Sequence, residues 1–233
     1  MRIIAALSKG GRASFISHLD VQRTLQRAMR RADLPLRFSN GFNPHPEMHF
    51  ATALSTGDES CCEWFDVLLD KAVIPEAFCK VLNAELPEGL SVAEAFEGKE
   101  VGFGSLTARL TAAEYRISFT PDTPAAPGTV EAALTAILKE KEIIIDKRTK
   151  GGMKKHDMRP QLLSARVLCD DGKRCELLVT GELTAAGGLR TEALMQVLTL
   201  RAGLTGEYRC RRTNMFFDGT LPLPVLPTAG VPV

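Results

Sequence analysis

Histidines cluster in the first part of the chain, where their side chains could carry acid–base chemistry. His18 follows Ser17, a good N-cap, and therefore stands at the start of a predicted helix. The positive end of the helix dipole lowers the pKa of an imidazole there and favours its neutral form. His18 is thus a candidate general base or acid acting on a ribose 2′-hydroxyl in metal-free RNA cleavage. The alternative is that His18 belongs to the helix cap, together with Asp20.

A rigid segment, Phe42-Asn43-Pro44-His45-Pro46, lies downstream of this helix. Each proline fixes its own φ and restricts the residue before it, which is typical of a loop that holds side chains in place. The alternative is a turn in which the polar side chains make only local hydrogen bonds. We expect one specific pocket formed by His18, Asp20, Asn43, His45, Asp157 and Arg159.

Metal binding is disfavoured by the spacing of the candidate ligands. His45 and His49 are four residues apart around Glu47, but the flanking prolines argue against the helix that a zinc site of this spacing requires. The six cysteines contain no C-x-x-C pair, which predicts small, reduced, mostly buried side chains. A site made by Cys61 or Cys62 with His45 or His49 is the alternative. We expect no metal and no cofactor.

Basic residues are segregated, although the net charge is only +1. Residues 1–57 sum to +5, residues 58–100 to −8, and residues 146–159 to +4. On the first helix the arginines recur opposite the apolar stripe, a spacing that would let them meet phosphates. The alternative is a solvated helix face. The candidate RNA-binding residues are Arg23, Arg27, Arg30, Arg31, Lys147, Arg148, Lys150, Lys154 and Lys155.

The pattern of apolar residues predicts an α+β protein made of two ferredoxin-like domains in tandem. Strands are expected at residues 2–7, 48–54, 62–69 and 90–96, with helices beginning near Ser17 and Pro75, which gives the order βαββαβ. The second half is less regular. It predicts a strand at 115–119, a helix at 129–138, a strand from 143, an antiparallel pair at 162–168 and 175–183, a helix at 191–200 and a strand at 208–213. The expected boundaries are 1–104, 105–217 and a Pro-rich tail at 218–233.

Two segments resemble the radical-SAM-linked family of bacterial proteins. These are Phe15-Ile16-Ser17-His18-Leu19-Asp20 and Phe38-Ser39-Asn40-Gly41-Phe42-Asn43-Pro44-His45-Pro46. A later segment is similar to a second signature of that family, namely Lys155-His156-Asp157-Met158-Arg159-Pro160. The resemblance implies a domain found beside, or fused to, a radical SAM protein with a cobalamin-binding-type domain. Because the chain lacks the cluster cysteines, the resemblance implies an accessory part with such an enzyme as its partner. The tandem architecture is also similar to that of CRISPR repeat endoribonucleases, at the level of fold alone.

These observations predict a cytoplasmic protein, since no apolar stretch approaches the roughly 20 residues that span a bilayer. The 233 residues, 45% of them hydrophobic, have the composition of an ordinary globular protein. The favoured function is an accessory RNA-binding module that presents a tRNA or rRNA to a radical SAM enzyme. The alternatives are a metal-independent endoribonuclease that uses His18, and a pure protein-interaction subunit whose acidic segment 58–100 faces that enzyme.

Overall fold

The computed structural model describes residues 1–98, 104–149 and 151–218, and it has an α+β fold. Lys150 and the Pro-rich tail beyond residue 218 lie outside the described residues. The chain divides into two compact units. The first comprises Met1–Leu110 and Arg212–Val233, and the second comprises Thr111–Arg211. The last strand, β11 (Gly206–Phe217), therefore contributes its beginning to the second unit and its end to the first.

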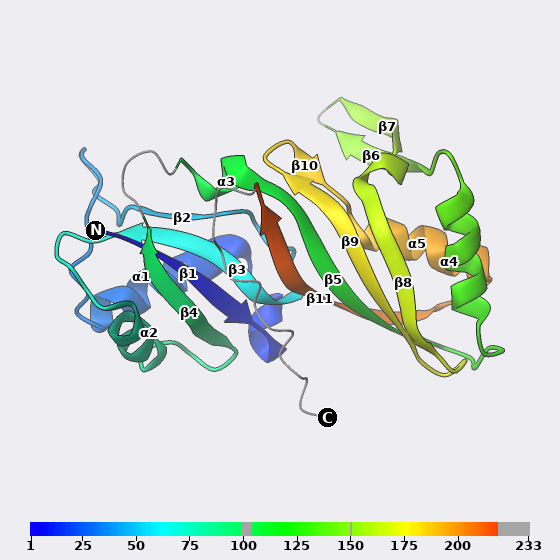
Figure 1. Ribbon diagram of the computed structural model, residues 1–233, viewed down its shortest axis with the longest axis horizontal. Helices are drawn as coiled ribbons and strands as arrows, with labels where there is room; N and C mark the ends of the chain where they lie inside the picture. The colour runs from blue at the N-terminus through cyan, green and yellow to red at the C-terminus, as the bar shows by residue number, and fades with distance from the viewer. Residues whose placement is uncertain (99–103, 150, 219–233) are drawn as a thin grey trace. The chain divides into compact units, whose positions relative to one another are not determined.

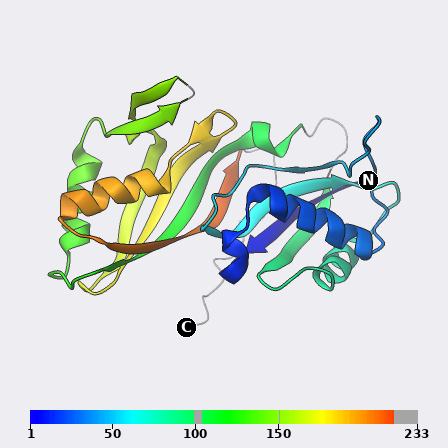
Figure 2. The ribbon, with the colours of Figure 1, turned by 180° about the vertical axis from the view of Figure 1, so that it is seen from behind.

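The first unit is a sheet with two helices on one face. Its strands, in the order β2-β3-β1-β4, are antiparallel neighbours, and β11 also pairs with β3. Figures 1 and 2 show α1 and α2 on the same face of this sheet. Two short helices complete the unit, η1 before α1 and α3 after β4. The bounds are β1 (Arg2–Lys9), η1 (Gly11–Phe15), α1 (His18–Arg31), β2 (Met48–Phe50), β3 (Glu59–Leu68), α2 (Pro75–Asn83), β4 (Leu90–Gly98) and α3 (Leu106–Arg109).

Helix α1 begins where its sequence predicts. The Ser17 hydroxyl accepts a hydrogen bond from the Asp20 backbone N–H at 3.2 Å, which satisfies one of the free donors of the first turn. Its apolar stripe, which includes Val21, Leu25 and Met29, is buried against the sheet. The helix ends at Arg31, ahead of Pro35, because a proline there cannot continue it.

Strand β1 is buried on both faces. Ile3, Ala5 and Leu7 belong to the core beneath the helices. Ile4 and Ala6 alternate with them and point to the opposite face, where they are also fully buried. The central strand therefore has no solvent-facing side over its middle, which explains its continuous apolar run.

The second unit repeats this strand order with additions. Strands β8 (Leu162–Asp170), β9 (Cys175–Thr184), β5 (Leu110–Pro121) and β11 are neighbours in that order, and the short β10 (Gly187–Gly188) also pairs with β9. Helices α4 (Thr129–Lys139) and α5 (Thr191–Ala202) pack on each other, and α5 lies across the strands in Figure 2. The predicted antiparallel pair around Asp171-Gly172 is confirmed as β8 and β9.

A separate two-stranded ribbon replaces the single strand that the sequence predicts after Lys141. Strands β6 (Ile144–Thr149) and β7 (Gly152–Asp157) pair only with each other and not with the larger sheet. The physical reason is their polarity, since charged residues fall on both faces and leave no apolar face to pack. The prediction of one strand with a loop was therefore wrong at this place. None of the helices in the described ranges has the length and apolar character needed to cross a membrane.

Burial decides the stability contributed by α1, and two of its leucines test this. Leu25 is fully buried, whereas Leu19 is 60% exposed on the same helix. We expect Leu25→Ala to lower the free energy of unfolding by about 2–5 kcal/mol, because it leaves a cavity in the core. The same change at Leu19 should lower the free energy of unfolding by about 0.5 kcal/mol or less. Denaturant unfolding followed by circular dichroism measures both, and equal losses would contradict this packing.

Candidate nucleic-acid interface

The basic residues of α1 are exposed, and most of them also have intramolecular partners. Arg31 pairs with the segment that follows α2, since its Nε lies 2.8 Å from the Glu85 carboxylate. Arg23 pairs with Asp20 at 3.3 Å, an exposed contact that contributes little to stability. Arg30 lies over the ring of Phe38, with its guanidinium carbon 5.4 Å from the ring centroid. For Arg27 the described residues show no ion pair, so the stripe offers at least this cation to a phosphate.

The predicted loop between Phe38 and Pro46 is exposed and locally hydrogen-bonded. Phe38 and Pro46 form an isolated antiparallel bridge at its base. Above it, the Ser39 backbone N–H donates to the His45 carbonyl at 2.9 Å, and the Ser39 hydroxyl lies 2.9 Å from His45 Nδ1. His45 is thus used in closing the loop. Asn43 is exposed near the tip.

His18 lies in a partly buried cluster of charged groups in the first unit. Its ring meets the edge of Phe50 with the centroids 5.0 Å apart. Burial lowers the pKa of His18, Lys9 lowers it further, and Glu63 opposes the change. Lys9 is buried and donates to the Ile16 carbonyl at 3.0 Å, and burial also lowers the pKa of this amine. The lowered pKa of His18 has the direction that the sequence predicts, but its first cause is burial and not the helix dipole.

Glu63 connects this cluster to the end of β11. Its carboxylate forms a 2.8 Å ion pair with Arg212, and both side chains are buried. A buried charge is costly unless it is paired, so these two side chains must be ordered together. The sequence patterns did not indicate a role for Lys9, Glu63 or Arg212. At Glu63 the available signal was a charged residue next to buried aromatic and apolar positions of β3, whereas Arg212 is one of three arginines in β11 and nothing distinguishes it from the others.

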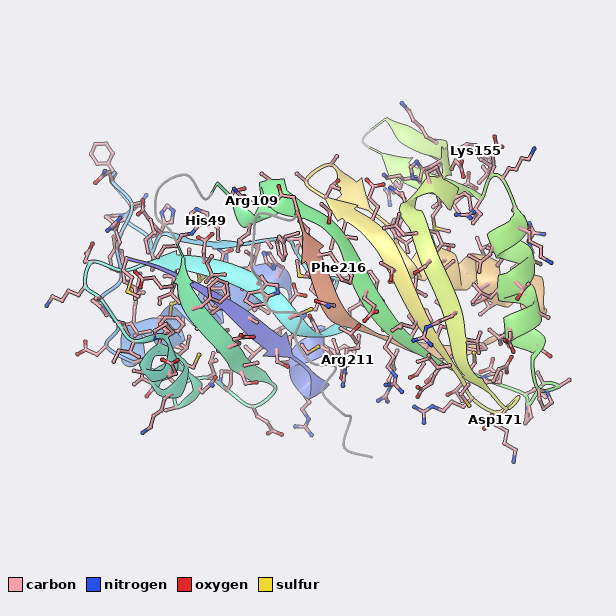
Figure 3. All side chains as sticks on the ribbon, in the orientation of Figure 1. His49, Arg109, Lys155, Asp171, Arg211 and Phe216 are labelled. Carbon is pink, nitrogen blue, oxygen red and sulfur yellow. The ribbon has the colours of Figure 1, made fainter. Side chains whose placement is uncertain are left out.

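A second buried ion pair lies on the face of the first sheet that α1 and α2 leave uncovered. Arg2 Nη2 and the Asp66 carboxylate are 2.5 Å apart, and both side chains are buried. The other oxygen of Asp66 lies 3.3 Å from Nδ1 of His49, whose side chain is 72% exposed. Figure 3 shows His49 on β2. The sequence analysis considered His49 only as a metal ligand and missed both Arg2 and Asp66.

The described residues contain no group of three or more His, Cys, Asp and Glu side chains placed to hold a metal ion.

The two adjacent cysteines, Cys61 and Cys62, contact β11 and the core. Cys61 Sγ lies 3.4 Å from the Thr213 carbonyl, on β11. Contact with Cys61 and then burial raise the pKa of the Cys62 thiol well above its usual range. Cys62 is therefore a protonated core residue.

The second signature segment, Lys155–Pro160, holds the base of the ribbon through hydrogen bonds. The Asp157 carboxylate accepts from the backbone N–H groups of Ile143 and Arg159, which lowers its pKa. The Arg159 guanidinium donates to the carbonyls of Leu138, Glu140 and Leu162 at 3.0–3.2 Å. Two of these carbonyls are at the C-terminal end of α4, where a helix leaves its acceptors unpaired.

Of the six residues expected to form one pocket, the four in the first unit lie at two separate places. His18 and Asp20 lie in the first turn of α1. Asn43 and His45 lie in the loop near its other end, because Arg30 contacts Phe38 at the base of that loop. Fourteen helical residues span about 20 Å, so His18 and His45 do not share a pocket. Asp157 and Arg159 belong to the second unit.

The ribbon concentrates positive charge. Lys147 lies directly opposite Lys154 in the β6–β7 register, and Arg148 lies opposite Met153. Lys155 has a counter-ion, since its amine is 2.9 Å from Asp146. Like charges directly opposite each other in a hairpin are destabilising, so the pair Lys147–Lys154 is unfavourable in the isolated chain. Figure 3 shows Lys155 on this ribbon, far from Asp171 at the other end of the unit.

Sequence and structure comparisons place the chain in a family and give its fold relatives. Residues 2–191 match the model of a family described as "Uncharacterized protein conserved in bacteria (DUF2344)". This description names no partner enzyme, so the radical SAM association remains an expectation from the resemblance. A sequence search of curated proteins found no match.

Solved structures with a similar fold include chains of ribonucleoprotein complexes. A chain in the crystal structure of a Cbf5–Nop10–Gar1 complex matches with a TM-score of 0.53 and 13% identity, over 94% of this chain and 50% of that one. An archaeal box H/ACA sRNP Nop10–Cbf5 complex gives a TM-score of 0.50 and 14% identity, over 94% and 50%. A chain of an H/ACA RNP bound to a substrate RNA containing 2′-deoxyuridine matches with a TM-score of 0.50 and 14% identity, over 94% of this chain and 49% of that one. The chain thus spans about half the length of these relatives, and at such identity the likeness shows the fold alone.

The stability contributed by the buried Arg2–Asp66 ion pair can be compared with that of the exposed Arg37–Asp70 pair. Asp66→Asn leaves Arg2 charged and buried, so we expect it to lower the free energy of unfolding by about 3–5 kcal/mol. Asp70, whose partner Arg37 is 3.2 Å away, is 63% exposed, and Asp70→Asn should cost less than about 1 kcal/mol. Denaturant unfolding of the two variants makes the comparison. An equally small loss in both would mean that Asp66 is not buried with Arg2.

Proposed function

We propose an RNA-binding role for this chain, which belongs to the bacterial family DUF2344. The β6–β7 ribbon would contact the phosphate backbone, and the arginine stripe of α1 would add further contacts. The single observation that carries this proposal is the placement of Lys147 directly opposite Lys154 on a ribbon outside the main sheet. A polyanion relieves the repulsion between the two ammonium groups, and each phosphate contact releases counter-ions.

The anchoring of the ribbon supports this role. A two-stranded hairpin is marginally stable by itself in water, so a projecting one needs support at its base. Arg159 and Asp157 supply it through hydrogen bonds to the end of α4 and to Ile143. Charges on a positioned ribbon lose less freedom on binding than charges on a flexible loop.

The structural relatives give the proposal a second, weaker support. Two of the three complexes are described as H/ACA ribonucleoproteins, and one of these two is bound to a substrate RNA. Because fold does not determine function, the extension to this chain rests on the charges described above.

Three finer features belong to the same proposal. The strand orders β2-β3-β1-β4 and β8-β9-β5-β11 support two ferredoxin-like domains in tandem. The sequence resemblance supports an accessory role beside a radical SAM enzyme. A tRNA or rRNA would then be the substrate that the chain presents.

Lys147→Glu separates RNA binding from fold stability. The change replaces a repulsive Lys–Lys pair with an attractive Glu–Lys pair, so we expect the ribbon to be as stable as before or slightly more stable. RNA affinity should nevertheless fall, and the slope of log affinity against log salt should decrease by about 0.7 or more per lost phosphate contact. Fluorescence anisotropy with a labelled small RNA at several salt concentrations measures both quantities.

The matched control is Lys173→Glu, which makes the same charge change at the exposed β8–β9 turn. It should leave affinity almost unchanged. Equal effects of the two substitutions would mean that net charge, and not the ribbon, governs binding. Failure of the wild-type protein to bind RNA at low salt would contradict the proposed function and favour a protein-interaction subunit.

A second candidate function, metal-independent RNA cleavage, is favoured by the surroundings of His18. A neutral, half-buried imidazole next to a buried lysine can accept a proton at neutral pH. We expect cleavage of small RNAs in EDTA to be lost in His18→Ala and kept in His45→Ala. With His18 as the base, the rate should rise with pH through its lowered pKa and then level off. Gel analysis showing no cleavage by the wild-type protein would exclude this activity.

A further inference from the structure

Phe42 is an unusually exposed aromatic residue on the surface of the first unit. Its side chain is 106% exposed, the highest value among the exposed large hydrophobic residues of the described chain. It lies in the loop between Phe38 and Pro46, which joins the buried residues Leu36 and Met48. Exposing a whole phenyl ring to water forgoes about 2 kcal/mol or more of burial free energy. A loop that needed only to turn would gain from a polar residue here.

The loop that carries Phe42 is held at its base. The Phe38–Pro46 bridge and the backbone hydrogen bond from Ser39 to His45 close it, and the Ser39 hydroxyl also contacts the His45 ring. Pro44 restricts the backbone between the tip and the closure. Phe42 is thus presented on a restrained loop, which reduces the entropy cost of a contact made by its ring.

The surroundings of Phe42 are polar and basic. Asn43 and His45 are exposed on the same loop. At its base, Arg30 covers Phe38 with a 5.4 Å cation–π contact, and Arg30 belongs to the exposed stripe of α1. A protein-docking patch brings several apolar side chains together, whereas Phe42 is carried on a loop whose Asn43 and His45 are also exposed, and Arg30 covers the ring of Phe38 at the base of that loop. This combination is typical of binding to single-stranded nucleic acid, in which bases stack on aromatic rings and cations meet phosphates.

We propose that Phe42 is a stacking platform for an unpaired base of single-stranded RNA, with the α1 arginines contacting the adjacent phosphates. This inference rests on the proposed function and adds the class of substrate, an RNA with unpaired bases rather than a continuous duplex. Asn43, the next residue along the loop, carries both a donor and an acceptor, which suits it to contact the edge of the stacked base.

The test compares Phe42→Ala with Phe15→Ala, the same change at another exposed phenylalanine, which is 73% exposed near the N-terminal end of α1. The probe is a labelled single-stranded RNA of about 12 nucleotides, and the same RNA annealed to its complement. We expect Phe42→Ala to lower the affinity for the single strand by on the order of 10-fold and to leave the duplex affinity unchanged. Phe15→Ala should change neither.

Salt dependence distinguishes stacking from loss of charge. Phe42→Ala removes no cation, so the slope of log affinity against log salt should stay at the wild-type value, while Arg27→Ala with Arg30→Ala should reduce it. Phe42→Trp should restore affinity, and its indole fluorescence should be quenched by bound RNA. The single native tryptophan, Trp64, is buried and provides a steady background. Because Phe42 is exposed, its substitution should not alter the unfolding midpoint.

The outcomes are distinguishable from a failure of the proposed function. If the wild-type protein binds RNA and Phe42→Ala binds the single strand equally well, the stacking proposal is overturned while RNA binding stands. An unquenched Trp at position 42 in the RNA complex overturns it in the same way. If Phe42→Ala keeps its affinity for the single strand and loses only the affinity for a protein, the ring is a protein contact and the proposal fails. A wild-type protein that binds neither RNA overturns both.

Discussion

The guanidinium of Arg159 is the contact on which the proposed interface depends. It donates to the carbonyls of Leu138, Glu140 and Leu162, and it thereby joins the end of α4, the base of the β6–β7 ribbon and the start of β8. The carbonyls of Leu138 and Glu140 lie at the end of α4, where a helix leaves its acceptors unpaired, so the same side chain both caps α4 and anchors the ribbon. Asp157 completes the junction by accepting from Ile143. The Asp-x-Arg-Pro segment, which the sequence suggested as part of a binding pocket, is on this account the support of the ribbon.

Buried ion pairs play a comparable part in the first unit. Arg2–Asp66 and Arg212–Glu63 place four charges in the interior, where only good pairing compensates for lost hydration. The first pair leads from Asp66 to the exposed His49, and the second leads from Glu63 to the neighbourhood of His18 and Lys9. The interior of the unit therefore holds two ion pairs, while the arginines of α1 are exposed.

Local signals in the sequence predicted the elements well and the contacts between distant residues poorly. Helix α1 followed from the Ser17 cap and an apolar stripe, and the β8–β9 pair followed from the turn at Asp171-Gly172. The Arg2–Asp66 pair joins residues 64 positions apart and depends on the β1–β3 register, which periodicity alone does not give. The sequence did not predict the ribbon, because both faces of its strands carry charged residues. No alternation of apolar and polar residues therefore indicates two strands there. The loop at Phe42 was identified as rigid, but the complete exposure of its ring needed the structure.

The central claim is that RNA lies against the ribbon. Ultraviolet cross-linking of the wild-type protein to a bound small RNA, followed by mass spectrometry of the modified peptides, tests it most directly. The account predicts cross-linked peptides from residues 144–157 of the ribbon, and further ones from α1 and the loop that follows it. Cross-links confined to the acidic segment 58–98, or none to the ribbon, would contradict it.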